Sequence, residues 1–266
     1  MFDKFNRKIN YLRISVTDRC NLRCIYCMPD EGVRLIEHNK IITYEEIVEI
    51  VKIAVDIKID KFRITGGEPL VRKGITGLIE MMAQIKGVKD LAMTSNGILL
   101  EEYAIQLADA GLHRINISLD TVNAEKFKLI TRGGDINRVF KGIDAAQKAG
   151  LTPIKINCVV RNSASEKDAQ EVMQFCKENG LEVRYIHQMS LSEGTFSVVE
   201  GGTGGDCRFC NRLRVTSDAK IKPCLFSDMA FDFRELGIEK ALKMALENKP
   251  EKGSQNHFNH FNNIGG

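Results

Sequence analysis

Two groups of three cysteines are the residues in this sequence best suited to metal chemistry. One group has the spacing C-x3-C-x2-C within "RCNLRCIYCMP", and the other has C-x2-C-x13-C within "CRFCNRLRVTSDAKIKPCLF". Thiolates are the preferred protein ligands of zinc and of iron–sulfur clusters. Each group therefore predicts a metal or cluster site. The first group is Cys20, Cys24 and Cys27, and the second is Cys207, Cys210 and Cys224.

Each group is one thiol short of the four ligands that a structural zinc ion takes. Near the first group the only histidine is His38. A four-iron cluster can be held by three thiolates, which leaves one iron open to a small molecule. For the first group we favour a cluster over a zinc loop with a remote fourth ligand. For the second group, spacing alone does not decide between zinc and a cluster.

Composition narrows the class of protein. Of the 266 residues, 43% are hydrophobic and 27% are charged, as in ordinary globular domains, and the net charge is only +3. We expect no DNA or RNA partner, although a local basic pocket is compatible with this charge. No apolar run is long enough for a membrane span, and the N-terminus lacks a secretory signal, so we expect a cytoplasmic protein without a membrane partner. In that reducing compartment, Cys158 and Cys176 are expected to be buried structural thiols.

Short apolar runs alternate with amphipathic stretches from residue 11 to about 189. The runs "YLRISV", "KFRIT", "LAMTS", "HRINISL", "PIKINCVV" and "EVRYIHQM" predict strands. Thr43 and Glu46 form a potential capping box, and glycines at 111, 150 and 180 are placed to end helices. The repeated strand–helix unit predicts an α/β fold with a parallel sheet, either open and doubly wound or an incomplete barrel. Functional groups should lie at the carboxyl edge of such a sheet.

The pattern changes after Met189. Residues 191–206 are rich in glycine and serine and predict a linker or flexible loop. The second cysteine group follows, then a short helix expected over residues 228–247. The tail "KGSQNHFNHFNNIGG" has little helical or strand character, and we expect it to be extended.

The cysteine loop and "TGGEP" after the second strand resemble the radical S-adenosylmethionine (SAM) superfamily. "YLRISVTDRCNLRCIYCMP", "RITGGEPL", "CRFCNRLRVTSDAKIKPCLF" and the terminal "IGG" are similar to the MoaA family of GTP 3′,8-cyclases. The resemblance covers nearly the whole chain. It implies an incomplete (β/α)6 TIM-type barrel over residues 1–190, the linker 191–206, and a small C-terminal extension, residues 207–266, that binds the second cluster and ends in a Gly-Gly tail.

The resemblance also implies two 4Fe-4S clusters and SAM as cofactors. The cluster on Cys20, Cys24 and Cys27 would bind SAM at its open iron and supply the electron that yields a 5′-deoxyadenosyl radical. Paired glycines allow a ligand to approach the backbone closely, which suits "TGGEP" to this role. The residues that match SAM contacts of the family are Tyr26, Gly67, Ser118 and Met189.

A second cluster on Cys207, Cys210 and Cys224 would bind the guanine ring of GTP, according to the same resemblance. The matching GTP contacts are Arg13, Arg63, Thr94, Lys155, Arg212, Leu213 and Arg214. Several Arg and Lys side chains are suited to a triphosphate because they form charge-assisted bonds. Arg13 and Lys155 each sit in an apolar strand, where their alternation with apolar neighbours allows them to point into a barrel lumen.

The terminal Gly265 and Gly266 have no side chains to pack, and such an end is usually disordered. In the MoaA family, however, the tail enters the active site and cyclisation depends on it. The resemblance therefore assigns a catalytic role to Gly265 and Gly266, together with Arg13.

The implied reaction is conversion of GTP, with SAM, to 3′,8-cyclo-7,8-dihydro-GTP, the first step of molybdenum cofactor biosynthesis. A lyase of this kind would also need a flavodoxin- or ferredoxin-type reductant and a downstream pterin-forming enzyme, and a homodimer is compatible with the family. The chain departs from the family in having only 17 residues between Met189 and Cys207, and in His187 and Ser190, where the family usually has an acidic residue and a proline. The alternatives are a related radical SAM enzyme acting on another nucleotide or a peptide, and a non-catalytic zinc-binding interaction protein.

Overall fold

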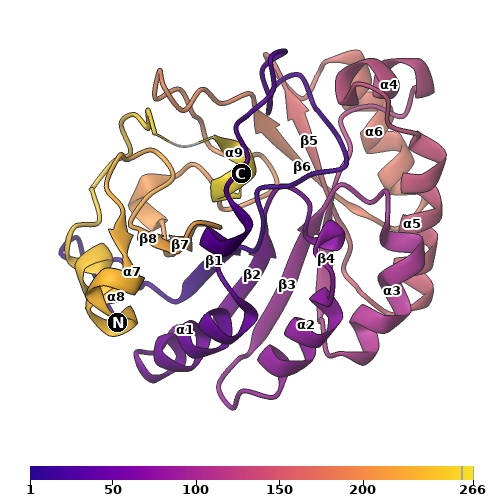
Figure 1. The fold of residues 1–266 in the computed structure, drawn as a ribbon. Coiled ribbons are helices and arrows are strands. Elements are labelled where there is room, and N and C mark those ends of the chain that lie inside the picture. Colours follow the sequence, from indigo (N-terminus) through magenta and orange to yellow (C-terminus); the bar gives the residue numbers. More distant parts are fainter. Residues whose placement is uncertain (259, 266) are drawn as a thin grey trace.

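A nine-stranded sheet forms the centre of the computed structural model, which describes residues 1–258 and 260–265 (Figure 1). The strand order is β6-β5-β4-β3-β2-β1-β7-β8-β9. The first six strands are parallel and neighbour one another in sequence order, without the reversal of a doubly wound sheet. The choice left open by the sequence is thus resolved in favour of a partial barrel. These strands are β1 Tyr11–Ser15, β2 Lys61–Thr65, β3 Asp90–Ser95, β4 Arg114–Ser118, β5 Lys155–Val160 and β6 Glu182–His187.

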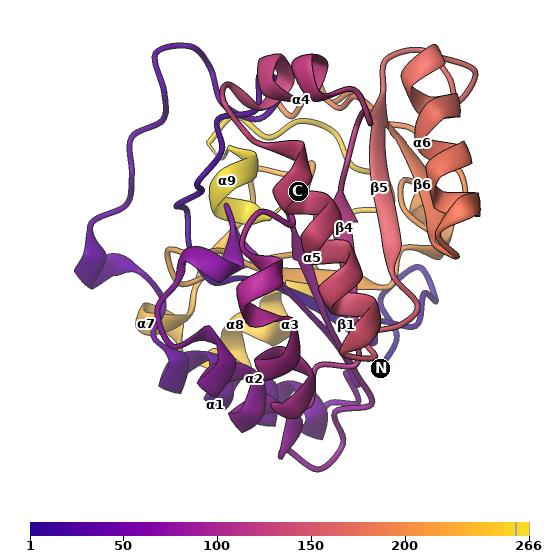
Figure 2. The same ribbon diagram turned by 90° about the vertical axis from the view of Figure 1, so that its right-hand side faces the viewer.

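Helices cover the outer face of these strands, as two perpendicular views show (Figures 1 and 2). The capping box at Thr43 and Glu46 is present, because each side chain accepts a hydrogen bond from the other residue's backbone N–H. Glycines 111, 150 and 180 follow helix ends with positive φ, as the sequence predicts. The helices are α1 Tyr44–Asp56, α2 Ile75–Ala83, α3 Leu100–Asp109, α4 Ala124–Thr131, α5 Ile136–Lys148 and α6 Lys167–Glu178. Short 3-10 turns lie at His38–Lys40 and Pro69–Val71.

Alternation along the strands separates the core from the barrel lumen. On β1, Leu12 and Ile14 are fully buried in the core under the helices. Tyr11 and Arg13 alternate with them along the strand, lie on the opposite, lumen side, and line a cavity. Because register pairs Arg13 with Arg63 on β2 and with Arg214 on β7, the same face of three adjacent strands carries arginine.

The C-terminal segment extends the barrel sheet instead of forming a separate layer. β7 (Arg212–Val215) pairs in parallel with β1, and β8 (Lys220–Lys222) and β9 (Phe231–Asp232) continue the sheet antiparallel. The helix expected over residues 228–247 begins later than predicted. It is divided into α7 (Phe233–Leu236) and α8 (Ile238–Glu247) by Gly237, whose φ is +84°.

The tail differs from the expected extended chain. Residues Phe261–Ile264 form the short helix α9, and Ile264 is fully buried. It packs in a second apolar cluster with Leu191, Leu225 and Phe226. This apolar contact holds residues 261–264 in place. The largely polar composition of the tail gave no indication of such a contact.

Residues 191–206 pack closely against the rest of the chain. Backbone bridges join Ser190 to Thr195 and Tyr185 to Glu200, and the Phe196 ring stacks on Phe226 with centroids 4.4 Å apart. Short approaches need glycine here: a Cβ on Gly205 would collide with the Ser197 carbonyl oxygen. The glycines of this segment therefore permit a tight fold.

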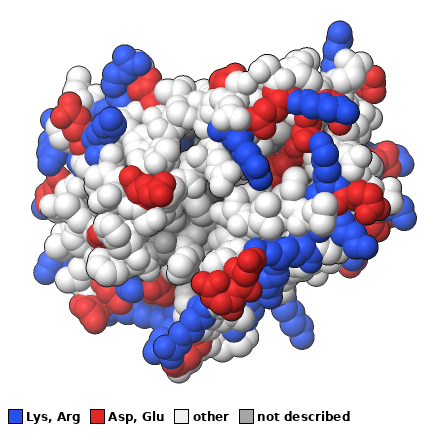
Figure 3. All heavy atoms as spheres, turned by 90° about the horizontal axis from the view of Figure 1, so that it is seen from above, with Lys and Arg blue, Asp and Glu red and all other residues white. Residues whose placement is uncertain are grey.

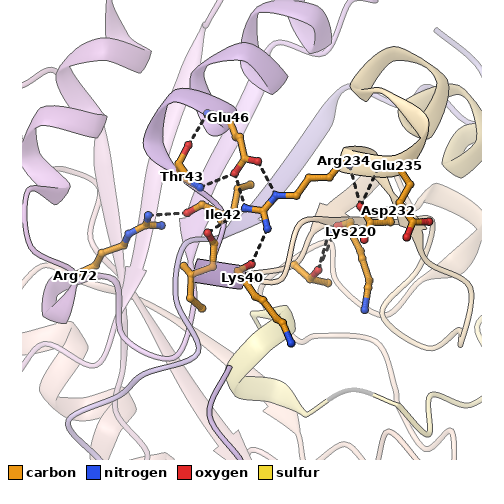
Figure 4. Close-up of polar contacts among 11 residues, drawn as sticks. Lys40, Ile42, Thr43, Glu46, Arg72, Lys220, Asp232, Arg234 and Glu235 are labelled. Atoms are coloured by element: carbon orange, nitrogen blue, oxygen red, sulfur yellow. Dashed lines mark hydrogen bonds and ion pairs between the residues drawn. The ribbon is translucent and has the colours of Figure 1, made fainter. Parts of the chain in front are cut away.

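Arg234 of α7 connects the C-terminal extension to the first barrel helix (Figure 4). Its guanidinium donates to both carboxylate oxygens of Glu46, over 2.6 and 2.8 Å. It also donates to the carbonyls of Lys40 and Ile41, each over 3.1 Å. Because Glu46 belongs to the capping box of α1, a single arginine joins the helix start, the preceding turn and the extension. Within the described residues, no helix is long and apolar enough to span a membrane.

We expect Arg234→Met to lower the free energy of unfolding by roughly 1–2 kcal/mol, because several charge-assisted bonds are lost together. Arg138→Met is the matched control, since Arg138 joins α3 and α5 through one exposed bond to Glu102. That variant should change stability by less than about 0.5 kcal/mol. Urea unfolding of both variants measures the difference, and equal midpoints would contradict the proposed connection.

Candidate functional site

Two adjoining cavities lie inside the partial barrel. The first, of about 200 Å³, includes Cys20, Cys24 and Cys27, and we call it the cysteine-loop cavity. The second, of about 300 Å³, includes Cys207, Cys210 and Cys224, and we call it the arginine cavity. Both are lined by Asn157, Ile186 and Met189. These three shared residues make the cavities immediate neighbours.

The cysteine-loop cavity is built from the carboxyl ends of the strands, where the sequence predicts functional groups. The loop after β1 supplies the three cysteines and Tyr26. The remaining walls come from the ends of β2 to β6 and from α9, and they include Thr65, Gly66, Gly67, Glu68, Thr94, Ser95, Asn96, Ser118, Val159, His187, Gln188 and Phe261.

The Gly66–Gly67 turn lies directly against the cysteine loop. Gly67 N–H donates to Thr17 O over 2.7 Å, and Glu68 N–H donates to Arg19 O over 2.8 Å. A Cβ on Gly67 would collide with the Arg19 carbonyl oxygen, so no other residue fits without moving the backbone. The turn thereby fixes the loop segment immediately before Cys20.

Two carboxyl groups stand beside the cysteine loop. Glu68 accepts hydrogen bonds from Ser95 Oγ over 2.9 Å and from Asn96 N–H over 2.6 Å, and burial raises its pKa to about 7. Asp120 accepts from the Tyr26 hydroxyl and from Val159 N–H, each over 2.8 Å, and burial raises its pKa to about 6. These hydrogen bonds hold Glu68 in place in the cavity wall and Asp120 against Tyr26, which lines the cavity.

Burial raises the pKa of Cys24 and of Cys27 to about 12, and it raises the pKa of Cys20 as well. A positively charged iron centre would reverse this, since metal-bound thiols are deprotonated. Among residues 1–258 and 260–265, no set of three His, Cys, Asp or Glu side chains converges on a single metal ion. A four-iron cluster has no such requirement, because each thiolate binds a different iron atom. The three-thiol donor set of this loop therefore fits a cluster.

The arginine cavity contains a large excess of positive charge. Its cationic lining residues come from β1, β2, β4, β6, β7 and the loop after α8: Arg13, Lys61, Arg63, Arg114, Arg184, Arg212, Arg214 and Lys249. Its two carboxylates are both paired, Asp90 with Arg114 and Asp206 with Arg208. By contrast, the outer face seen in Figure 3 mixes charges of both signs. Positive charge is thus concentrated inside the molecule.

The residues that the structure describes supply too little negative charge to balance these cations. Burial lowers the pKa of Arg184, and it lowers that of Arg214 to about 10. The Nε atoms of Arg63, Arg184 and Arg212 are buried and make no hydrogen bond within the described part of the chain. Buried cations are costly unless an anion neutralises them. The cavity is therefore suited to a polyanion.

The segment 191–206 forms one wall of the arginine cavity through Phe196, Ser197, Val199 and residues 202–206. Arg212 Nη2 donates to the carbonyl oxygen of Thr203 over 2.9 Å. The short connection between β6 and the second cysteine group therefore contributes to the site, and it orients one of the arginines.

The second cysteine group lies at the edge of this cavity in a cationic environment. Burial raises the pKa of the Cys210 thiol, but Lys249 and Arg212 outweigh burial and the net shift is downward. For Cys224 burial dominates and the pKa is raised, although Lys249 and Arg214 oppose the increase. Cations that favour the thiolate of Cys210 and oppose the effect of burial at Cys224 fit a metal or cluster site.

Gly265 lies against Arg214, which lines the arginine cavity, and against Thr65, which lines the cysteine-loop cavity. Arg214 Nη1 donates to the Gly265 carbonyl oxygen, and Gly265 N–H donates to Phe261 O over 3.0 Å. At Gly265 φ is +70°, and a Cβ would collide with Thr65 Oγ1. Only glycine fits this position. The expectation for Gly266 falls outside the described residues.

The structure brings most of the sequence-predicted residues to the two cavities. Tyr26, Gly67, Ser118, Met189 and Thr94 line the cysteine-loop cavity, and Met189 also faces the other. Thr94 accepts a 3.4 Å hydrogen bond from Arg63 Nη1 and so connects the two sites. Arg13, Arg63, Arg212 and Arg214 line the arginine cavity.

Three of the predicted residues that the structure describes line neither cavity: Gly265, Leu213 and Lys155. The Leu213 side chain is fully buried in the core under the helices, because it alternates with Arg212 and Arg214. Lys155 lies on the same strand face as Asn157, but its ammonium pairs with Glu182 on β6. Neither side chain therefore faces the cavities.

Sequence reasoning missed several cationic residues of the arginine cavity. Lys61 is two positions before Arg63, and Arg184 interrupts the apolar run of β6, so strand alternation could have indicated both. Arg114 begins β4 in the same way. Lys249 lies outside any strand, in "ENKPEK", and no local pattern distinguishes it from a surface lysine.

Comparisons with known proteins agree with this geometry. Residues 14–176 match the radical SAM superfamily. A GTP 3′,8-cyclase of Thermodesulfovibrio yellowstonii is 41% identical over 282 residues, covering 89% of this chain and 88% of that protein. A GTP 3′,8-cyclase of Alkaliphilus oremlandii is 40% identical over 300 residues, covering 95% and 94%. The 300 aligned positions exceed the 266 residues of this chain, so the alignment leaves gaps in this chain. Such gaps are expected from the short connection before Cys207.

Solved structures show the same fold at low identity. Streptococcus suis SuiB bound to S-adenosylmethionine superposes with a TM-score of 0.70 at 16% identity, covering 91% of this chain and 66% of that one. Native anSMEcpe with bound AdoMet gives a TM-score of 0.64 at 17% identity, covering 90% and 81%.

We expect Gly67→Ala to displace the cysteine loop, because the new methyl group would meet the Arg19 carbonyl. Iron bound by Cys20, Cys24 and Cys27 should fall at least about fivefold, and stability should decrease by roughly 2–4 kcal/mol. Gly77→Ala is the control, since a Cβ at this position in α2 meets nothing within 4 Å. It should stabilise the protein by about 0.5–1 kcal/mol. Iron analysis and urea unfolding measure both effects; normal iron content in Gly67→Ala would contradict this account.

Proposed function

Because the chain belongs to the radical SAM superfamily and to its GTP 3′,8-cyclase family, we propose that it uses SAM to convert GTP to 3′,8-cyclo-7,8-dihydro-GTP. This is the first step of molybdenum cofactor biosynthesis. Members of the superfamily hold SAM on a 4Fe-4S cluster. The proposal assigns that cluster to the cysteine-loop cavity and GTP to the arginine cavity.

The adjacency of the two cavities is the observation that supports the proposal best. A radical must meet its substrate before it reacts elsewhere, so both must be bound within contact distance. Asn157, Ile186 and Met189 line both cavities, so the cavities adjoin at these three residues. A nucleotide bound in the arginine cavity could therefore present its ribose to the cysteine-loop cavity.

In the cysteine-loop cavity, the chain's task is to hold SAM. The bound cluster would supply the electron that cleaves SAM. The Gly66–Gly67 turn permits close approach of a ligand to the backbone, and Glu68 next to it can accept hydrogen bonds from an ammonium group. We assign the remaining contacts to Tyr26, Ser118 and Met189, which line the same cavity.

In the arginine cavity, the guanidinium groups would bind the triphosphate. Arg13, Arg63, Arg212 and Arg214 match GTP contacts of the family, and the geometry adds Lys61 and Arg184. Lys155 would also bind the triphosphate if its ammonium left Glu182, its half-exposed ion-pair partner, and paired with a phosphate instead. Leu213 could contribute only through its backbone, since its side chain is in the core. Thr94, bonded to Arg63, would sit between the two substrates.

We infer that Cys207, Cys210 and Cys224 would hold a second 4Fe-4S cluster, which would supply a binding site for the guanine ring. Support comes from their position in the lining of the arginine cavity and from Lys249 and Arg212, which favour the thiolate form of Cys210. Electrons would come from a flavodoxin- or ferredoxin-type protein, and the product would pass to a pterin-forming enzyme of the same pathway.

The activity test is anaerobic reconstitution with iron and sulfide, followed by incubation with SAM, dithionite and GTP. We expect 5′-deoxyadenosine and the cyclised guanine product in equal amounts. ATP and a peptide substrate are the controls for the alternative substrates. If 5′-deoxyadenosine formed only at the rate seen without GTP, the assignment of GTP would be wrong. Colourless protein containing zinc would instead favour a binding module.

We expect Gly265→Ala to separate SAM cleavage from cyclisation. A methyl group at this position would collide with Thr65 and displace the tail from Arg214, so product should fall at least about tenfold while some 5′-deoxyadenosine still forms. Gly150→Ala is the control, because φ there is +77° but a Cβ meets nothing within 4 Å. It should lower stability by about 1 kcal/mol without changing product yield. Full yield from Gly265→Ala would contradict a role for the tail position.

A further inference from the structure

The two cysteine groups lie in different electrostatic environments. At the first, charges of both signs are present: Glu68 acts on Cys20, opposed by Arg23, whose guanidinium donates to Cys20 O over 2.5 Å, and Asp120 acts on Cys24. The second group is surrounded mainly by cations, namely Arg212 and Lys249 at Cys210, and Arg214, Lys222 and Lys249 at Cys224. Two clusters of the same type in such different surroundings would differ in how readily they accept an electron.

Lys249 is the cation most firmly built into the second group. It follows α8, and only 1% of the residue is exposed. Its ammonium donates to Arg212 O over 2.7 Å and to Pro223 O over 2.8 Å. Arg212 is two residues after Cys210, and Pro223 directly precedes Cys224. One ammonium thus links the two chain segments that carry these ligands, and it also makes a hydrogen bond to the Cys210 thiol.

Arg7 extends this connection to the third cysteine. Its guanidinium donates to Cys207 O over 2.8 Å, to Pro250 O over 2.7 Å and to Glu251 O over 2.9 Å. A buried ion pair with Asp3, 2.6 Å long, holds the guanidinium in place. The segment that begins at Lys249 is therefore connected to the chain around all three cysteines. Arg7 links it to Cys207, and Lys249 links it to the segments that carry Cys210 and Cys224.

Lys222 adds a second buried cation. It is fully buried on β8, and its Nζ has no hydrogen-bond partner among residues 1–258 and 260–265. Asp228 and Asp218 act on it electrostatically, and so does Cys224, which lies two residues further on. A buried ammonium without a hydrogen-bond partner is costly unless anions lie nearby. A thiolate-bound cluster would add its negative charge to that of the two carboxylates.

We propose that Lys249 is a positioning residue that holds the ligands of the second cluster together and, with Lys222, raises the reduction potential of that cluster above that of the first. This inference rests on the second cluster assigned above. Reduction adds negative charge to a cluster, and nearby buried cations stabilise the reduced state more than the oxidised one. The potential of an iron–sulfur cluster depends on the charges and hydrogen bonds around it.

The experiment compares Lys249→Gln with Lys249→Arg in anaerobically reconstituted full-length protein. Glutamine keeps a donor for the two carbonyls but loses the charge, whereas arginine keeps both. Lys252→Gln, at an exposed position three residues later, is the matched control. Replacing Cys20, Cys24 and Cys27 by alanine leaves the second cluster alone for measurement. Iron content is determined first, and redox titration followed by electron paramagnetic resonance then gives each potential.

We expect the second cluster of Lys249→Gln to titrate at a more negative potential than in the wild type, with Lys249→Arg and Lys252→Gln unchanged. Loss of the second cluster's iron in Lys249→Gln, with retention in Lys249→Arg, would equally support the role of the charge. An assembled cluster with an unshifted potential in Lys249→Gln would overturn the inference and leave the proposed function intact. Absence of a second cluster from the wild type would overturn both.

A measurement on the wild type covers the case in which both Lys249 variants fail to assemble the cluster. Proteins with either cysteine triplet replaced by alanine report the two potentials separately. The inference requires the cluster on Cys207, Cys210 and Cys224 to have the higher potential. The reverse order would overturn it.

Discussion

The concentration of positive charge inside the barrel is the constraint on which the rest of the site depends. Arginines at matching register on β1, β2 and β7 point to the lumen, and burial lowers the pKa of Arg214 to about 10. An anionic occupant would offset the cost of burying these cations. The paired carboxylates, Asp90 and Asp206, do not meet that need. A nucleoside triphosphate and an anionic cluster together would supply enough negative charge to balance these arginines.

The C-terminal extension completes the site because it continues the barrel sheet. β7 adds Arg212 and Arg214 next to Arg13, which closes the lumen on the side left open by β1. The tail then returns over the carboxyl ends of the strands, where Asn262 donates to Asp18 O over 3.1 Å and Ser217 N–H donates to Asn263 O over 3.0 Å. These hydrogen bonds join the C-terminal tail to the loop that follows β1 and to the end of β7.

The sequence predicted the six barrel strands, the helix ends at Gly111, Gly150 and Gly180, and the cysteine groups, because each depends on local signals. Alternation places Arg13 on the lumen face, and the capping box marks the start of α1. What it missed depends on contacts between distant segments. The tail is held partly by the packing of Ile264 against Leu191, Leu225 and Phe226, which are distant in sequence. Lys249 is recognisable as part of the site only once its contacts with Arg212 and Pro223 are known. Strand order resolved the barrel, which periodicity alone left open.

The central claim is that GTP and SAM occupy adjoining cavities so that the adenosyl group meets the ribose directly. GTP carrying deuterium at ribose C3′ tests this most directly. With SAM and reductant, we predict that deuterium appears in 5′-deoxyadenosine, as detected by mass spectrometry. 5′-Deoxyadenosine that forms with GTP present but carries no deuterium would contradict the arrangement of the two cavities as neighbouring substrate sites.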